Sequence, residues 1–267
     1  MVTIPVFILL MCVGLLAGIA AGLLGVGGGI VTTPFCAIIY PKLGVHPEIL
    51  HKVIFGTNFF MISFSSLISS FRYHVRGLVL WKGVFPIAAF SIFGAFAGAA
   101  FAALVPDIFL RRLFGAFMLL VGIRMFIDYK VDSEKEPSFY LPALALTGFS
   151  TAVFSTMIGV GGGILTIPIM IFLLRYPVRK APGTSSSIIV FTSIAAMIGY
   201  AVSGWNDLRI ADGAFGYVHL EFGMPLMCGA IVGAPIGTWI NQKISTRRLK
   251  QVFGLFMFIM FVKMAFF

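Results

Sequence analysis

Long stretches without a charged residue constrain this chain more than any other feature. They cover residues 1–41, 53–71, 83–106, 137–174, 181–206 and 222–242. A helix that crosses a bilayer needs about 20 consecutive apolar residues. Apolar residues make up 60% of the chain and charged residues 10%, against roughly 25% charged in soluble proteins. Much of this apolar surface must face lipid. Because a barrel would show short alternating strands instead, the sequence predicts an all-α polytopic membrane protein.

The charged residues indicate that this basic chain has a lipid bilayer, and not nucleic acid, as its partner. The formal net charge is +10, and the basic residues stand between the apolar stretches. Lys and Arg in that position anchor loops beside anionic lipid on the cytoplasmic face. We therefore expect a multi-pass protein of the cell inner membrane. The first residues lack the basic region of a cleaved signal peptide, so we expect the first apolar run to remain.

Neither the cysteines nor the histidines show the spacing of a metal site. Cys12, Cys36 and Cys228 lie inside apolar runs without paired spacing, and the four histidines lie in expected loops or span ends. The spans also lack converging acid and base residues. We therefore expect no metal, no cofactor and no enzymatic activity.

The two halves of the chain share a pattern of residues. Gly159–Pro168 matches Gly25–Pro34 at an offset of 134, and the segment 180–185 resembles the segment 52–58. Further on, a constant offset of 139 holds across about fifty residues. One offset over that length is hard to obtain by chance, so the pattern predicts a duplication. The predicted units are a first transmembrane repeat at 1–127, a charged linker at 128–138 and a second repeat at 139–267, with an insertion at about 204–215.

The segments Gly25–Pro34 and Gly159–Pro168 both read Gly-Val-Gly-Gly-Gly-Ile-X-Thr-X-Pro. These two glycine-rich elements, each followed by a Lys…Gly-Thr-(Ser/Asn) element, resemble the TauE/SafE sulfite exporter family. The resemblance covers nearly the whole chain. It implies a secondary transporter that moves small sulfur-containing anions such as sulfite, thiosulfate or organosulfonates. An anion channel, or a carrier for small carboxylates, is the alternative.

Each run of three glycines predicts a helix that is broken inside the membrane. Glycine costs a helix interior about 1 kcal/mol per residue relative to alanine, and lipid offers no partner for the freed backbone groups. Broken helices at matching positions of two halves are the best sequence indication of a transporter binding site. A helix that restarts at Ile30 or Ile164 would direct free N–H groups at the break, which suits an anion. Alternatively, the glycines only allow helices to pack closely.

Two further elements leave two interpretations open. Thr57, Asn58, Thr184 and Ser185 either cap the starts of helices or face the same cavity as the breaks. Lys52 and Lys180 either attract the anion or extend toward the interface as anchors. The predicted substrate-binding residues are Gly27, Gly28, Gly29, Thr32, Thr33, Lys52, Thr57, Asn58, Gly161, Gly162, Gly163, Thr166, Lys180, Thr184 and Ser185.

No carboxylate lies in the middle of a predicted span, so a buried proton relay is not expected. Export of an anion needs none, because a potential of about 100 mV, negative inside, favours the exit of each negative charge by about 2.3 kcal/mol. Sodium held by carbonyls at the breaks is the other possibility for coupling.

The number of crossings depends on the path of the two broken stretches. If each crosses once, the chain has eight spans in parallel halves. If each enters and returns, it has ten crossings in inverted halves. The second arrangement places 13 of the 19 Lys and Arg residues on one side, which the positive-inside rule favours. We therefore expect inverted halves, in a monomer or a homo-oligomer.

Overall fold

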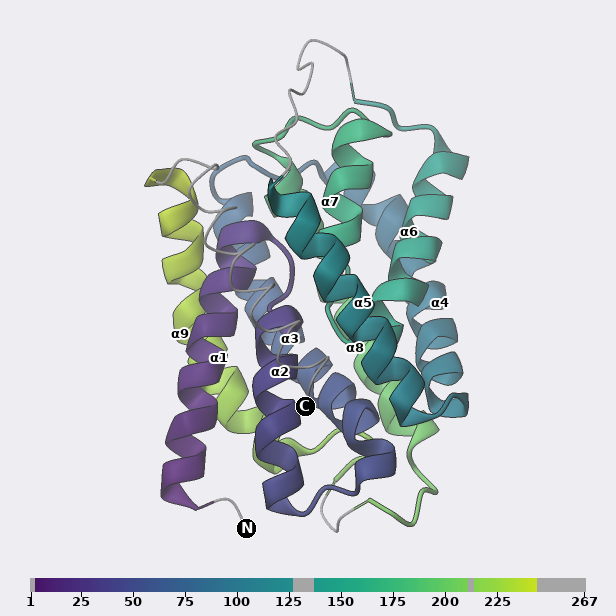
Figure 1. Ribbon diagram of the computed structural model, residues 1–267. Coiled ribbons are helices and arrows are strands. Elements are labelled where there is room, and N and C mark those ends of the chain that lie inside the picture. The colour runs from purple at the N-terminus through teal and green to yellow at the C-terminus, as the bar shows by residue number, and fades with distance from the viewer. Residues whose placement is uncertain (1–2, 127–136, 211–213, 244–267) are drawn as a thin grey trace.

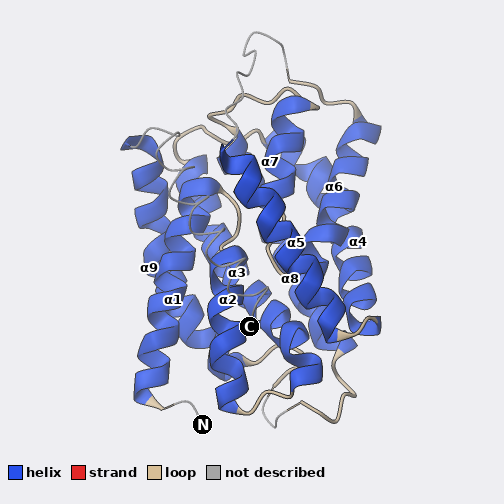
Figure 2. Cartoon of the chain, in the orientation of Figure 1, coloured by secondary structure: helices blue, strands red, loops and turns tan. Residues whose placement is uncertain are grey.

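Every regular secondary-structure element in the part of the chain that the structure describes is a helix (Figures 1 and 2). The computed structural model describes residues 3–126, 137–210 and 214–243. The α-helices are α1 (Ile4–Leu24), α2 (Gly29–Ile39), α3 (Leu50–His74), α4 (Trp81–Leu104), α5 (Asp107–Phe126), α6 (Leu141–Met157), α7 (Gly163–Phe172), α8 (Ala181–Ser203) and α9 (Leu220–Lys243). Two short 3-10 helices, η1 (Tyr40–Leu43) and η2 (Pro47–Ile49), connect α2 to α3. Most of the charged linker at 128–138 and the end of the second repeat, residues 244–267, lie outside these residues.

Five of these helical segments are long and apolar enough to cross a membrane. They are Ile4–Leu24, Pro47–His74, Trp81–Leu104, Ala181–Ser203 and Leu220–Asn241. Large apolar side chains such as Phe85, Phe93 and Leu104 lie on the outside of the bundle, where a soluble protein would place polar groups. The prediction of an all-α polytopic membrane protein is confirmed.

The first broken stretch enters the bundle and returns to the same end. α1 ends at Leu24, with Gly25 as its C-cap, and α2 runs back beside it (Figure 1). α1 packs along α9 in parallel, since Gly14 meets the backbone of Leu226 and Gly22 meets that of Ala234. η1 reaches the same end of the molecule, where Tyr40 packs on Phe222 near the start of α9.

The second broken stretch, α6 and α7, enters from the opposite end. α6 runs parallel to α4, because Gly148 meets the backbone of Ile87 and the α4 residue Gly98 meets that of Val153. α3 and α8 lie antiparallel at the centre: Tyr73 approaches Gly183, and Phe59 stacks on Tyr200. The two hairpins therefore point toward each other, as the ten-crossing arrangement requires. A duplication as the origin of the halves stays a prediction.

The predicted helix boundaries need two corrections. α2 begins at Gly29 and α7 at Gly163, one residue before the expected restarts. The interpretation of Thr57 and Asn58 as capping residues is wrong, because α3 begins at Leu50 and both lie in its interior. Lys52, which precedes the uncharged stretch 53–71, also lies inside α3, and its ammonium group donates to the backbone carbonyl of Ala103.

The corresponding correction holds for α8. This helix begins at Ala181, with Pro182 in its first turn, and its N-cap position makes no side-chain hydrogen bond. Thr184 and Ser185 follow in the first two turns and are fully buried. Neither is the N-cap, and both are free to contact other elements.

Candidate functional site

The two helix breaks meet in the middle of the bundle. A Cβ atom built on Gly27 would lie 3.4 Å from the Cα of Gly161, and one built on Gly161 would lie 3.5 Å from the Cα of Gly27. The side chain of Ile62, from α3, lies within 3.2 Å of both positions. Residues 134 positions apart in the sequence thus face each other at one point.

The backbone conformations of the two breaks also correspond. Gly27 and Gly28 have φ values of 90° and 88°, and Gly161 and Gly162 have values of 88° and 93°. These left-handed conformations favour glycine because it has no Cβ. The residue that follows in each break, Gly29 or Gly163, must be glycine for a second reason, because the backbone of the other break lies against it. A Cβ on Gly29 would overlap the carbonyl oxygen of Gly159, and a Cβ on Gly163 would overlap that of Gly25. No other residue fits these two positions without a shift of the backbone.

Backbone N–H groups converge on this contact from both sides. Val31 and Thr32 donate to the carbonyl of Gly28, as Leu165 and Thr166 donate to that of Gly162. In the part of the chain that the structure describes, no acceptor is recorded for the N–H groups of residues 27–30 or 161–164. These groups open α2 and α7, so each carries the positive end of a helix dipole.

Hydroxyl and amide groups surround the breaks. The Thr33 hydroxyl donates to the carbonyl of Gly29 at 2.8 Å and accepts from Asn58 Nδ2 at 2.9 Å. Because that hydroxyl has used its only proton, Asn58 must present its amino group to it. Asn58 Oδ1 then has no partner, although the residue is fully buried.

The second break has a related but different set of contacts. Thr166 donates to the carbonyl of Gly162 at 3.0 Å, whereas its counterpart Thr32 donates to that of Gly29, and not of Gly28, at 3.2 Å. Ser185, from α8, donates to the carbonyl of Gly25 at 2.9 Å and so ties the second half to the first break. Eleven of the predicted site residues, all but the two lysines, Thr57 and Thr184, therefore form the breaks or contact them.

Thr57 and Thr184 hold the ends of the bundle instead. The Thr57 hydroxyl accepts from the backbone N–H of His219 at 3.0 Å, and that of Thr184 accepts from Leu80 at 3.1 Å. Both acceptors are fully buried. These bonds fasten α3 and α8 to the segments that precede α9 and α4, so they position helices and lie away from the breaks.

The two lysines lie at opposite ends of the molecule. Lys52 stands in the first turn of α3, is buried, and donates from Nζ to the carbonyl of Ala103 at 2.6 Å. Lys180 stands half-buried at the start of α8. Asn58 follows Lys52 by six residues, a rise of about 9 Å along a helix. The lysines therefore flank the central contact from either end and are not part of it.

Sequence reasoning missed two tyrosines that hold the ends of the entering helices. Tyr73 donates to the carbonyl of Gly22 at 2.8 Å, and Tyr200 donates to that of Thr156 at 2.9 Å. Both carbonyls lie at the ends of helices, where no intrahelical donor remains. The offsets, 127 between the tyrosines and 134 between their acceptors, equal those of the corresponding sequence elements. Aligning the segments 56–73 and 183–200 would have paired the two tyrosines.

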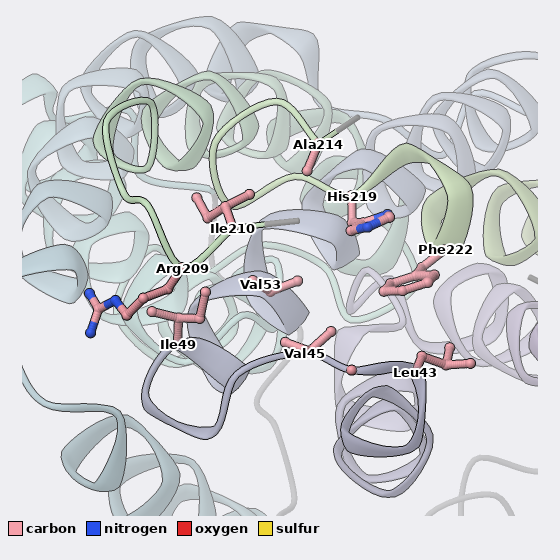
Figure 3. Close-up of a pocket in the computed structure, with 10 residues that line it drawn as sticks. Leu43, Val45, Ile49, Val53, Arg209, Ile210, Ala214, His219 and Phe222 are labelled. Atoms are coloured by element: carbon pink, nitrogen blue, oxygen red, sulfur yellow. The ribbon is translucent and has the colours of Figure 1, made fainter. Parts of the chain in front are cut away.

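Two pockets lie at the end of the molecule where α3 and α9 begin. The smaller, of about 30 Å³, has room for a water molecule and is lined by His219, Phe222 and residues of η1 and the loop before α9 (Figure 3). The larger is an open groove of about 710 Å³ between the starts of α3 and α5. Among the described residues, no group of three His, Cys, Asp or Glu side chains is placed to hold a metal ion.

Comparison with known proteins shows the family to which this chain belongs. The profile described as "Sulfite exporter TauE/SafE" matches residues 10–264. This chain belongs to the TauE/SafE sulfite exporter family. A "probable membrane transporter protein" of Methanocaldococcus jannaschii is 31% identical over 257 residues, which cover 93% of this chain and 94% of the relative. No solved structure matches the chain.

Other TauE/SafE relatives agree. A "probable membrane transporter protein" of Haemophilus influenzae is 26% identical over 97% of this chain and 98% of its own length, and YunE of Bacillus subtilis is 25% identical over 92% of each. The family and these names identify the chain as a multi-pass membrane transporter.

Proposed function

We propose that this TauE/SafE protein is a secondary transporter that exports small sulfur-containing anions, such as sulfite, thiosulfate or organosulfonates, across the cell inner membrane. The anion binds where the two helix breaks meet. The observation that supports this proposal best is the convergence of unpaired N–H groups from the starts of α2 and α7 at one buried contact.

The charge character of this contact favours an anion. Two helix N-termini approach it from opposite directions, and each contributes a partial positive charge of about half a unit. No carboxylate is recorded in a hydrogen bond with the break residues in the part of the chain that the structure describes. A site built from dipoles binds an anion without the desolvation cost of a buried lysine. Because the site carries no full charge, the anion can also leave it.

The size of the contact favours a small oxoanion. Glycine forms the walls on both sides, and the backbones touch across them. A compact group with several acceptor oxygens can engage N–H donors of both breaks at once, as sulfonate and sulfite groups do. The hydroxyls of Thr33, Thr166 and Ser185 donate to carbonyls in the present state, and each can rotate to donate to an anion instead.

The inverted hairpins suit alternating access. The contact between the breaks is closed in this structure, and the hairpins lead from it toward opposite ends of the molecule (Figure 1). Movement of one hairpin against the other would expose the contact to one side at a time. Export down the membrane potential then requires no carboxylate in the spans.

A panel of anions tests the substrate class directly. Sulfite, thiosulfate, taurine, sulfoacetate, acetate and succinate would be titrated into the purified full chain while thermal unfolding is followed. We expect one or more of the sulfur-containing anions to raise the midpoint, because a ligand of the folded state stabilises it. Stabilisation by the carboxylates alone would replace the proposal with a carboxylate carrier.

A further inference from the structure

The groove between the starts of α3 and α5 contains a histidine that the transport site does not use. His51 lines this groove of about 710 Å³ and is 3% exposed. Its Nδ1 lies 2.6 Å from Asp107 Oδ2, and its backbone N–H donates to Asp107 Oδ1 at 2.7 Å. Its Nε2 is itself buried and has no hydrogen-bond partner.

The Asp107 carboxylate decides which ring nitrogen of His51 carries the proton. A carboxylate only accepts, so the nitrogen beside it must be the donor in the neutral ring. Nε2 is then left with a lone pair that would repel an anion. A doubly protonated ring would present Nε2 as a charge-assisted donor while Nδ1 keeps its hydrogen bond to Asp107. Protonation of His51 would therefore turn Nε2 from an acceptor, which repels an anion, into a donor that can bind one.

Lys52, the residue after His51, lines the same groove. Its Nζ makes one recorded hydrogen bond, to the carbonyl of Ala103, and lies 5.8 Å from the ring centre of Tyr217. An ammonium group has three donors, so Lys52 keeps donors for a ligand. The groove thus places a lysine with spare donors beside a histidine with an unpaired nitrogen.

The other charged groups around the groove balance one another in part. Glu48 from η2, Asp107 and Arg111 from α5, and Arg209 from the loop after α8 line it along with Lys52. Arg209 pairs with Glu48 at 2.9 Å and with Asp207 at 2.7 Å, so two carboxylates share one guanidinium group. With Asp207 included, three basic groups stand beside three carboxylates, so the formal charges around the groove are balanced and the sum becomes positive only when His51 gains a proton.

We propose that this groove is a second binding site for small oxoanions, in which Lys52 and the protonated ring of His51 hold the anion. This inference rests on the proposed function, since it makes the groove a station between the helix breaks and one end of the molecule. Binding of the anion and binding of a proton to His51 are then linked, and each strengthens the other.

Thiosulfate is the probe, because it stays a dianion between pH 6 and pH 8. Its binding to the purified full chain, in nanodiscs of phosphatidylcholine, would be measured by calorimetry at both pH values and at matched ionic strength. The wild type should bind about tenfold more tightly at pH 6, the gain expected from one charge-assisted hydrogen bond. His51→Gln should bind equally at both pH values. His46→Gln, an exposed histidine at the same end, should keep the wild-type ratio.

A wild-type ratio near one, or an unchanged ratio in His51→Gln, would overturn the inference. If His51→Gln does not fold, Asp107→Asn serves instead, because it removes the partner that stabilises the ring cation and should shrink the ratio. Asn58→Leu, which alters the breaks and leaves the groove intact, separates the two proposals. It should keep the pH ratio while transport falls; loss of the ratio in this variant would mean that thiosulfate binds only at the breaks.

The phosphate of a lipid headgroup is also an oxoanion and could bind in the groove, so a separate experiment tests it. The titrations would be repeated in nanodiscs with equal amounts of phosphatidylcholine and phosphatidylglycerol. Anionic lipid should weaken thiosulfate binding to a similar extent in the wild type and His46→Gln through surface potential, and leave the pH ratio in place. Complete loss of thiosulfate binding would identify a lipid site and contradict the inference. A wild type that transports no sulfur anion would refute the proposed function but would leave this pH ratio unaffected.

Discussion

At the scale of single residues, the glycines of the breaks differ in what they exclude. A Cβ on Gly28 would lie 2.7 Å from the carbonyl of Ala17, and one on Gly162 would lie 3.2 Å from Ser155 Oγ. Both residues also have positive φ. A large side chain at either position would disturb the fold as well as the site. Removing polar atoms around the breaks is therefore the cleaner way to test binding.

The reciprocal contact of Gly29 and Gly163 gives a prediction about stability. Gly29→Ala or Gly163→Ala should lower the free energy of unfolding by about 2 kcal/mol or more, because the new methyl group overlaps a backbone carbonyl of the other break. Gly115→Ala is the matched control, since a Cβ there meets nothing within 4 Å, and it should leave stability unchanged or raised. Thermal unfolding in one detergent checks all three. Equal stability of the three variants and the parent protein would show that the breaks do not pack this tightly.

The Asp207 carboxylate gives a prediction about pH. Its hydrogen bonds with Arg209 hold the pKa of Asp207 well below its usual range. The pair therefore stabilises the protein fully above about pH 4, the ordinary pKa of aspartate, and loses this contribution as the pH falls further. The gain is about 1 kcal/mol or less, because Arg209 is 41% exposed and solvent screens the pair. Asp207→Asn should lower the unfolding midpoint at pH 7 and weaken its decline below pH 4. A parallel decline in both proteins would contradict this assignment.

The two flanking lysines should differ in their effect on transport. Lys52→Gln should raise the apparent KM for thiosulfate several-fold at low ionic strength, because Lys52 is buried beside the groove. Lys180→Gln should have a smaller effect that added salt removes, since its half-buried ammonium group is screened more easily. Initial rates at two ionic strengths distinguish them. Unchanged KM values for both variants at low ionic strength would make both lysines interfacial anchors.

At the scale of elements, the sequence predicted the broken helices well and the start of α3 poorly. Three glycines inside an apolar stretch leave backbone groups that only a break can accommodate, so local composition decides the outcome. The start of α3 depends instead on a contact with a distant element. Lys52 can lie inside the helix because its ammonium group donates a hydrogen bond to the carbonyl of Ala103. Ala103 is distant in the sequence, so the residues near Lys52 do not predict this partner.

The roles of the hydroxyl residues show the same limit. Ser185 and Asn58 were placed near the breaks correctly, because they follow the glycine elements at similar spacing in each half. Thr57 and Thr184, one residue before them, point in another direction and accept hydrogen bonds from the backbone N–H groups of His219 and Leu80. Neighbours on a helix point about 100° apart, so only the packing of α3 and α8 decides which one meets the site.

At the scale of the whole molecule, the distribution of Lys and Arg predicted the opposed hairpins without any contact information. The pairing of helices could not be predicted in this way. α1 packs on α9, and α4 packs on α6, so the broken helix of each half packs against a long helix of the other half. These partners lie far apart in the sequence in the first case. Small residues on each helix allow such packing with several neighbours.

The orientation in the membrane can be tested at two exposed positions. In a background with Cys12, Cys36 and Cys228 replaced by serine, Tyr140→Cys and Leu208→Cys would be treated with an impermeant thiol reagent in intact cells. Leu208→Cys, at the end where α9 begins, should be labelled. Tyr140→Cys, beside the linker, should be labelled only after the membrane is opened. Labelling of Tyr140→Cys in intact cells would place the linker outside and contradict the predicted orientation.

The measurement that tests the central claim most directly is thiosulfate efflux from proteoliposomes that contain the purified full chain. Efflux should saturate with concentration and accelerate when the interior is made negative. Thr33→Val and Asn58→Leu, which remove polar atoms at the breaks with little change in volume, should each lower the rate about tenfold or more, by loss of hydrogen bonds to a charged group. Thr151→Val, which removes a buried hydroxyl bonded within α6, is the control and should transport normally. Normal efflux in both break variants, or efflux that rises linearly without saturation, would contradict an anion carried between the two helix breaks.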